Sequence, residues 1–114
     1  PYVPTPLALD KHFLLLGDGG ILSSVNSETG THSWSERVFQ DQAYSSPVSS
    51  GDRIFCISRS GKIAVVSANP NSFKLLGTAE LGDPCDSTPA IAGGRLIIRT
   101  AHKLFCLAPK DARP

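Results

Sequence analysis

The chain repeats one pattern nearly three times, and this repeat constrains the fold more than any other feature. Pro6, Pro47 and Pro89 lie 41 and 42 residues apart, and each follows a small hydroxyl residue, Thr5, Ser46 or Thr88. Four residues after each proline comes a pair typical of a two-residue β-hairpin turn, followed by an apolar run. The pairs are Asp10-Lys11, Gly51-Asp52 and Gly93-Gly94. A period of this kind predicts repeated hairpins.

Each copy continues into further strands. After the apolar runs HFLLL, RIFCI and RLIIR, a second turn leads to ILSSVN, KIAVVS and KLFCL. The first two copies pass through a third turn into THSWSERVFQ and FKLLGTAEL, whereas the third copy stops at Leu107. No segment has a sustained helical period, and 10 Gly and 9 Pro residues punctuate the chain. We therefore expect an all-β fold of four-stranded antiparallel units, with three strands in the last.

Four antiparallel strands in about 40 to 45 residues are typical of one β-propeller blade. We expect one blade over residues 1–41, a second over 42–84, an incomplete three-stranded blade over 85–109 and a polar tail over 110–114. A propeller has about four to eight blades, which need more residues than the 114 present. The sequence thus predicts a partial ring, the C-terminal part of a longer propeller whose last blade takes its outermost strand from the far N-terminus.

A partial ring leaves surfaces that would otherwise be covered. Residues 103–107 are expected to form an open strand edge, and the first and last units should each have one uncovered apolar face. We therefore expect that the chain is not a simple monomer. Its partners would be the rest of the parent propeller or other copies of the chain, and three copies joined head to tail could approximate a ring.

Charge and hydropathy favour neither nucleic acid nor membrane as a partner. Eleven Lys and Arg against ten Asp and Glu leave a formal charge of +1, without a run of like charges. The apolar runs are too short to span a bilayer, and no segment has the regions of a signal peptide. The chain opens with Pro1 and not Met. The alternative therefore stays open that it is an excised or processed piece with a targeting signal upstream.

Three cysteines, Cys56, Cys85 and Cys106, lack C-x-x-C spacing. This pattern excludes a disulfide-dense scaffold and a standard structural zinc site. One disulfide with a remaining thiol stays open, but cysteines in apolar runs such as IFCI and LFCL are more often small buried hydrophobes. The redox compartment is therefore undetermined.

The remaining candidate groups favour turn and surface positions over catalysis. The histidines, expected as solvated turn residues without ligand spacing, are His12, His32 and His102. Asp18 and Asp52 stand beside glycines, as in ordinary turns, and the spacing of a calcium loop is absent. No G-x-S-x-G occurs, nor a G-x-G-x-x-G before a helix. Scattered arginines could line a channel mouth or be solvated charges: Arg37, Arg53, Arg59, Arg95 and Arg99.

The features that carry a family resemblance are the start at Thr/Ser-Pro, the apolar hairpin, the runs GILSSVN and GKIAVVS, and the segment SETGTHSW. With them, over residues 2–107, the chain resembles the repeat of quinoprotein-type (pyrroloquinoline-quinone, PQQ) β-propellers. The resemblance implies a motif that docks one blade onto the next, matched here by Asn26, Thr29, Gly30 and Trp34. In the second copy Leu75 falls where the tryptophan would be, and Asn69-Pro70-Asn71 replaces the Thr-Gly turn. We expect weaker or purely hydrophobic docking there. A tryptophan could also stack on a ligand.

The resemblance implies two classes of function. The first is a non-catalytic scaffold that binds a protein or peptide, exported to the periplasm or cell envelope of a bacterium. The second is a fragment of a PQQ- and calcium-dependent dehydrogenase. Such enzymes have an adjacent Cys-Cys pair beside the cofactor and an acidic base, and no such pair occurs here. We expect the scaffold, with no catalytic residue, cofactor or metal in this segment.

Overall fold

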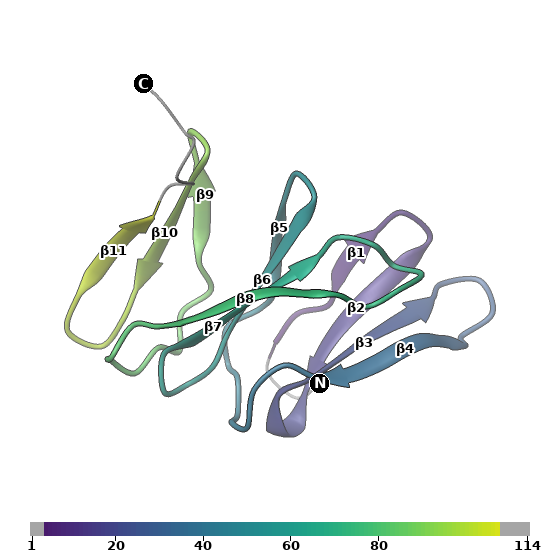
Figure 1. Cartoon of the computed structure of the whole chain (residues 1–114), viewed down its shortest axis with the longest axis horizontal. Helices are drawn as coiled ribbons and strands as arrows, with labels where there is room; N and C mark the ends of the chain where they lie inside the picture. Colours follow the sequence, from purple (N-terminus) through teal and green to yellow (C-terminus); the bar gives the residue numbers. More distant parts are fainter. Residues whose placement is uncertain (1–3, 108–114) are drawn as a thin grey trace.

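The structure, a computed structural model, describes residues 4–107, whose strands form three antiparallel sheets (Figure 1). The first sheet consists of β1 (Leu7–Leu9), β2 (His12–Gly17), β3 (Ile21–Asn26) and β4 (His32–Arg37), with the 3-10 turn η1 (Asp18–Gly20) between β2 and β3. The middle sheet consists of β5 (Val48–Ser50), β6 (Arg53–Ile57), β7 (Lys62–Ser67) and β8 (Leu75–Glu80). The third sheet consists of β9 (Ala90–Ala92), β10 (Arg95–Arg99) and β11 (Leu104–Leu107).

The prediction of an all-β fold with four, four and three strands is confirmed. In each sheet the strands follow chain order, so within residues 4–107 the third sheet ends in the edge strand β11. The three sheets lie within the expected ranges 1–41, 42–84 and 85–109, and the tail 110–114 lies outside the described residues. No helix in the described part of the chain is long and apolar enough to cross a membrane.

The first turn of each copy has the expected two-residue form. Leu9 pairs with His12 and Ser50 pairs with Arg53, so only two residues separate the strands. The first turn residue has a positive φ in each copy, 54° at Asp10, 58° at Gly51 and 57° at Gly93. Glycine adopts this conformation without cost and Asp tolerates it, which is why these residue types mark the repeat.

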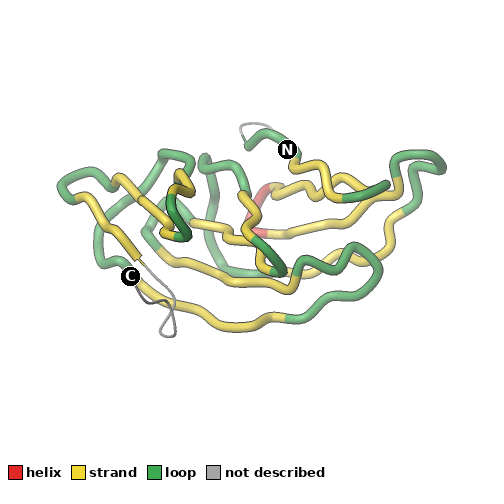
Figure 2. The backbone as a smooth tube through the Cα atoms, turned by 90° about the horizontal axis from the view of Figure 1, so that it is seen from above, coloured by secondary structure: helices red, strands yellow, loops and turns green. Residues whose placement is uncertain are grey.

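The middle sheet packs on both sides, between the other two (Figures 1 and 2). Ile54 and Cys56 of β6 lie in a core shared with the first sheet. Ile57 of the same strand lies in a second core, shared with Leu96 and Ile98 of the third sheet. Because successive side chains of a strand point to opposite faces, a strand covered on both faces needs the consecutive apolar residues seen in RIFCI.

The outer faces of the first and third sheets differ. On the first sheet Phe13 is 43% exposed, and on the third Leu104 is 72% exposed. Arg99 also lies on the outer side of the third sheet, because Leu96 and Ile98 point inward. The equivalent residue of the middle sheet, Ile57, is fully buried. The third sheet therefore presents a charge where an identical docked unit would bury an apolar side chain.

Candidate functional site

The predicted docking residues and the hydrogen bonds between sheets lie at two seams, which are the interfaces between neighbouring sheets. The first seam lies between the first and middle sheets, and the second seam lies between the middle and third sheets. Each seam is an apolar core with polar contacts at its ends. Beside the fourth strands the Trp34 and Phe73 rings fill the first seam, whereas within residues 4–107 the second seam contains a cavity.

Three of the four predicted docking residues form one turn. The Asn26 side chain accepts hydrogen bonds from the N–H groups of Glu28 (2.9 Å) and Thr29 (3.1 Å). The N–H of Gly30, where φ is 74°, donates to the Asn26 carbonyl at 2.8 Å. These bonds fix where β4 begins, and β4 carries Trp34 into the first seam.

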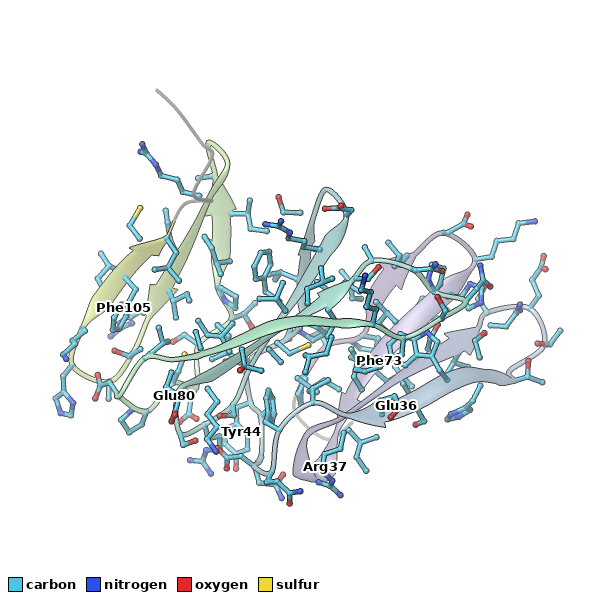
Figure 3. The ribbon with its side chains drawn as sticks, in the orientation of Figure 1. Glu36, Arg37, Tyr44, Phe73, Glu80 and Phe105 are labelled. Atoms are coloured by element: carbon cyan, nitrogen blue, oxygen red, sulfur yellow. The ribbon has the colours of Figure 1, made fainter. Side chains whose placement is uncertain are left out.

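Trp34 meets a loop of the middle sheet. Its Nε1–H donates to the Asn69 carbonyl at 3.4 Å, and its ring meets Phe73 edge-on, with 5.2 Å between the centroids. The Ser24 hydroxyl, opposite Trp34 on β3, donates to the Pro70 carbonyl at 2.7 Å. Figure 3 shows Phe73 over the first sheet, beside β8. Residues 69–73 thus close this end of the first seam.

The prediction that His12 is a solvated turn residue is wrong. His12 begins β2 with its side chain on the same face as Leu14 and Leu16, and it is 7% exposed. Its Nε2 lies 3.1 Å from the Ser33 hydroxyl of β4. His32 and His102 are exposed, as expected.

The prediction that Leu75 takes the place of the docking tryptophan is also wrong. Trp34 pairs with Ser24, and the equivalent pair in the middle sheet is Gly77 with Val65. Leu75 instead pairs with Val66, which points toward the first seam. The reason is the turn before β8, which is closed by a bond from Ser67 to Lys74, whereas a bond from Asn26 to Thr31 closes the shorter turn before β4. Two extra residues move the register by two.

The second seam contains a cavity of about 380 Å³. Its apolar wall includes Phe55, Ile63, Val65 and Ala79 of the middle sheet and Leu96 and Leu107 of the third. Asp52, Arg53 and Arg95 line its rim. A cavity of this volume is within the range of ligand sites.

Two aspartates, which the sequence analysis missed, hold the seams from the linkers. Asp41 accepts a hydrogen bond from the Ser60 N–H at 2.9 Å, in the β6–β7 turn of the middle sheet. Asp83 accepts bonds from the His102 N–H (2.7 Å) and the Thr100 hydroxyl (2.6 Å), in the β10–β11 turn of the third sheet. Each aspartate lies six residues before the repeat proline, so alignment of the copies could have revealed the pair.

Both carboxyl groups are strongly acidic. For Asp41, burial by itself raises the pKa, but hydrogen bonds from the side chain and N–H of Ser60 outweigh it and lower the pKa to about 2. For Asp83, the hydrogen bond from the His102 side chain and then that from Thr100 lower the pKa to about 2. The ordinary value is 3.8 for both. Folding therefore favours the carboxylate form.

These pKa values predict acid destabilisation. A carboxyl group whose pKa is lowered in the folded state stabilises the fold at pH values above its pKa in the unfolded state. That contribution is lost as pH falls from about 4 to about 2. We expect Asp83→Asn to lower the free energy of unfolding at pH 7 and to flatten its fall over this pH range. Urea unfolding at a series of pH values measures both effects. Asp52→Asn, in an exposed turn, is the matched control and should keep the wild-type acid profile.

Hydroxyl groups before the repeat prolines join the sheets at the opposite end. The Thr5 N–H donates to the Ser46 Oγ at 2.8 Å, and the Ser46 N–H donates to the Thr88 Oγ1 at 2.9 Å. The same donor and acceptor positions recur at both seams. The small hydroxyl residue that marks each copy is therefore a link between neighbouring sheets.

The arginines do not converge on one channel mouth. Arg59 lies over the Tyr44 ring, 4.0 Å from its centroid, and forms a 2.9 Å salt bridge with Asp86, which raises the pKa of Arg59. Arg37 donates to the Gly19 carbonyl. Of the five arginines, only Arg53 and Arg95 line the cavity of the second seam.

The cysteines divide by burial, and all three are free. Cys56 and Cys85 are buried, and burial raises the pKa of the Cys56 thiol to about 12. The expectation that Cys106 is buried is wrong, because it lies on the outer face of the third sheet, opposite Ile97.

In the described part of the chain, no group of three or more His, Cys, Asp or Glu side chains comes together that could hold a metal ion. Asp52 lies in the exposed β5–β6 turn, as expected. Only the backbone of Asp18, in η1, is described.

Neither a protein-family model nor a curated protein matches the sequence. The structure is similar to the crystal structure of BamB from Moraxella catarrhalis, with a TM-score of 0.79 over 96% of this chain, at 14% sequence identity. BamB is a PQQ-like β-propeller. The chain has the fold of consecutive propeller blades. It spans about a third of the length of BamB, since it covers 33% of that chain, and its three blades form a partial ring whose last blade has three strands.

Proposed function

We propose that the chain is a non-catalytic, PQQ-like propeller segment that acts as a protein- or peptide-binding scaffold in the bacterial cell envelope. The observation that carries this proposal is the use of the polar side chains at the seams. The side chains of Asp41, Asp83 and Ser46 accept hydrogen bonds from backbone N–H groups of a neighbouring blade or the linker that precedes it. These groups build a frame, and large apolar side chains such as Phe13 and Leu104 stay exposed on the outer faces. The envelope location is supported by the likeness to BamB.

We further propose that Trp34 docks the first blade onto the middle blade. Its bond to the Asn69 carbonyl and its contact with Phe73 support this role. Asn26, Thr29 and Gly30 act on docking through the turn that places β4. In the middle blade Gly77 has no side chain to play the same part, so docking of the third blade depends on the apolar core and on Asp83.

The second candidate is a fragment of a PQQ- and calcium-dependent dehydrogenase. Calcium needs six to eight oxygen ligands, several of them from carboxylates. No cluster of three acidic, histidine or cysteine side chains occurs in residues 4–107, and no cysteine adjoins another. The described residues therefore do not fit a calcium or PQQ site, and this candidate would need the residues of other blades.

A dye-linked dehydrogenase assay with added PQQ and calcium separates the two candidates. We expect no turnover of alcohols or glucose by the protein above the rate of the quinone alone, and no change in the PQQ absorption spectrum on mixing. Saturable turnover that depends on both additions would overturn the scaffold proposal. Fractionation of cells that express the parent protein tests the location, and recovery only in the cytosol would contradict it.

We propose that the outer faces associate with the rest of the parent propeller or with copies of this chain, and that Arg99 limits the second mode. Replacing Arg99 with isoleucine removes the charge at the position of the buried Ile57. We expect R99I to self-associate at a roughly tenfold lower concentration than the wild type in sedimentation velocity. Arg95→Ile is the control, since its counterpart Arg53 is itself exposed. A monodisperse 12.1 kDa particle for the wild type and for R99I at all concentrations would refute self-association.

A further inference from the structure

The two seams are formed by equivalent strands, but different side chains occupy the space between the sheets. In the first seam the Trp34 ring and the Phe73 ring close the space beside Ser24. In the second seam the equivalent of Ser24 is Val65, which lines the cavity of about 380 Å³. The cavity therefore lies where the first seam holds an aromatic pair.

Gly77 is the reason for the difference on the middle-blade side. It pairs with Val65 on β8, as Trp34 pairs with Ser24 on β4. A Cβ added to Gly77 would meet no atom within 4 Å, and its φ is not in the left-handed region. The glycine thus leaves open space and is not required by the backbone conformation.

The rim of the cavity favours an acidic group. Arg53 and Arg95 lie on it together with Asp52, so cations outnumber anions. Within residues 4–107 neither arginine takes part in a salt bridge. The residue that corresponds to Arg53 at the first seam is His12, which is buried and bonded to Ser33, so an exposed cation at this position is specific to the second seam.

The segment that follows Leu107 does not supply matching chemistry. Leu107 lines the cavity, and residues 108–114 have the sequence APKDARP. This segment contains no aromatic residue. Its two cations, Lys110 and Arg113, outnumber its one anion, Asp111, so its charge does not complement a rim that is already cationic. An aromatic occupant must therefore come from outside residues 108–114.

We propose that the cavity of the second seam binds an aromatic side chain of a partner peptide segment in which acidic residues flank the aromatic residue. The ring takes the space that Trp34 and Phe73 fill in the first seam, and the flanking carboxylates meet Arg53 and Arg95. The open edge strand β11 ends at the same cavity with Leu107, which lets an extended segment pair alongside it. This inference rests on the proposed scaffold function and identifies the chemistry of its partner.

The test uses the 114-residue chain and the peptide acetyl-Glu-Trp-Glu-amide in ¹H–¹⁵N NMR titrations. We expect saturable shifts of amides around the cavity, including Gly77, Val65 and Leu96, and at least fivefold weaker binding of the neutral peptide acetyl-Gln-Trp-Gln-amide. Gly77→Trp fills the cavity from within, so it should weaken binding at least tenfold. It should also raise the melting temperature, which shows that the variant is folded.

Leu75→Trp is the matched control. It places the same side chain two residues away on β8, opposite Val66 and toward the first seam, and should bind the peptide as the wild type does. Arg53→Gln with Arg95→Gln should remove the preference for the acidic peptide over the neutral one. Equal binding by the wild type and by folded Gly77→Trp would overturn the proposal, as would equal affinity for the free compound indole-3-acetate, which would assign the cavity to a small molecule. Saturable shifts confined to another face would overturn this site and leave the scaffold function standing, whereas quinone-dependent turnover would overturn that function.

Discussion

Replacing Gly61 with alanine is expected to lower the free energy of unfolding by about 3 kcal/mol or more. Gly61 has a φ of 91°, and an added Cβ would overlap the carbonyl oxygen of Asp83 in the linker to the third blade. The strain is therefore of two kinds, the left-handed backbone and a steric clash with main-chain atoms that cannot rotate away. The linker would have to move, and with it the Asp83 carboxylate that caps the next turn.

Gly51→Ala separates the two kinds of strain. Gly51 also has a positive φ, 58°, but a Cβ there would meet no atom within 4 Å. We expect this control to cost only about 1 kcal/mol, the typical backbone cost for alanine in that region. Urea unfolding followed by circular dichroism gives both free energies. Equal losses for the two variants would show that the clash with the linker contributes nothing.

Replacing Trp34 with alanine is expected to lower the free energy of unfolding by about 2 to 4 kcal/mol. The ring is partly buried, packs against the core of the first seam and meets Phe73 edge-on. Its loss also leaves the Asn69 carbonyl without the indole donor. The measurement is again urea unfolding followed by circular dichroism, because the variant has no tryptophan whose fluorescence could report unfolding.

A double-mutant cycle with Phe73→Leu tests whether the aromatic contact itself joins the blades. We expect a coupling energy of about 0.5 to 1.5 kcal/mol between the two positions, the usual value for an edge-to-face pair. Leu75→Ala serves as the control for Phe73→Leu, since Leu75 is 45% exposed and begins β8 two residues after Phe73. If the Trp34 and Phe73 effects add without coupling, the contact does not contribute to docking beyond the area that each ring buries.

Strand positions followed closely from the sequence. β3, β6, β7 and β10 coincide with the runs ILSSVN, RIFCI, KIAVVS and RLIIR. Each of these runs begins directly after a Gly-containing turn, so local chemistry determines where the strand starts. β4 and β8 follow less constrained turns, and there the alignment of Leu75 with Trp34 failed by two residues.

Side-chain environment was harder to predict than strand position. His12 and Cys106 were both expected in the wrong environment, because each is one residue of a strand whose two faces meet different surroundings. Asp41 and Asp83 were missed because a hydrogen bond to a turn about 20 residues away leaves no mark within either copy. Comparison of the copies shows the repeated aspartate, but only the folded chain shows which N–H groups it accepts.

Local sequence patterns are enough to predict a series of four-, four- and three-stranded antiparallel units, since turn residues and the period of the apolar runs act over a few residues each. How neighbouring units meet follows from the folded arrangement and not from these patterns. Register across a turn of variable length placed Gly77, and not Leu75, opposite Val65 and opened the cavity of the second seam. Contacts between sheets depend on the relative position of side chains from separate copies, which no local pattern encodes.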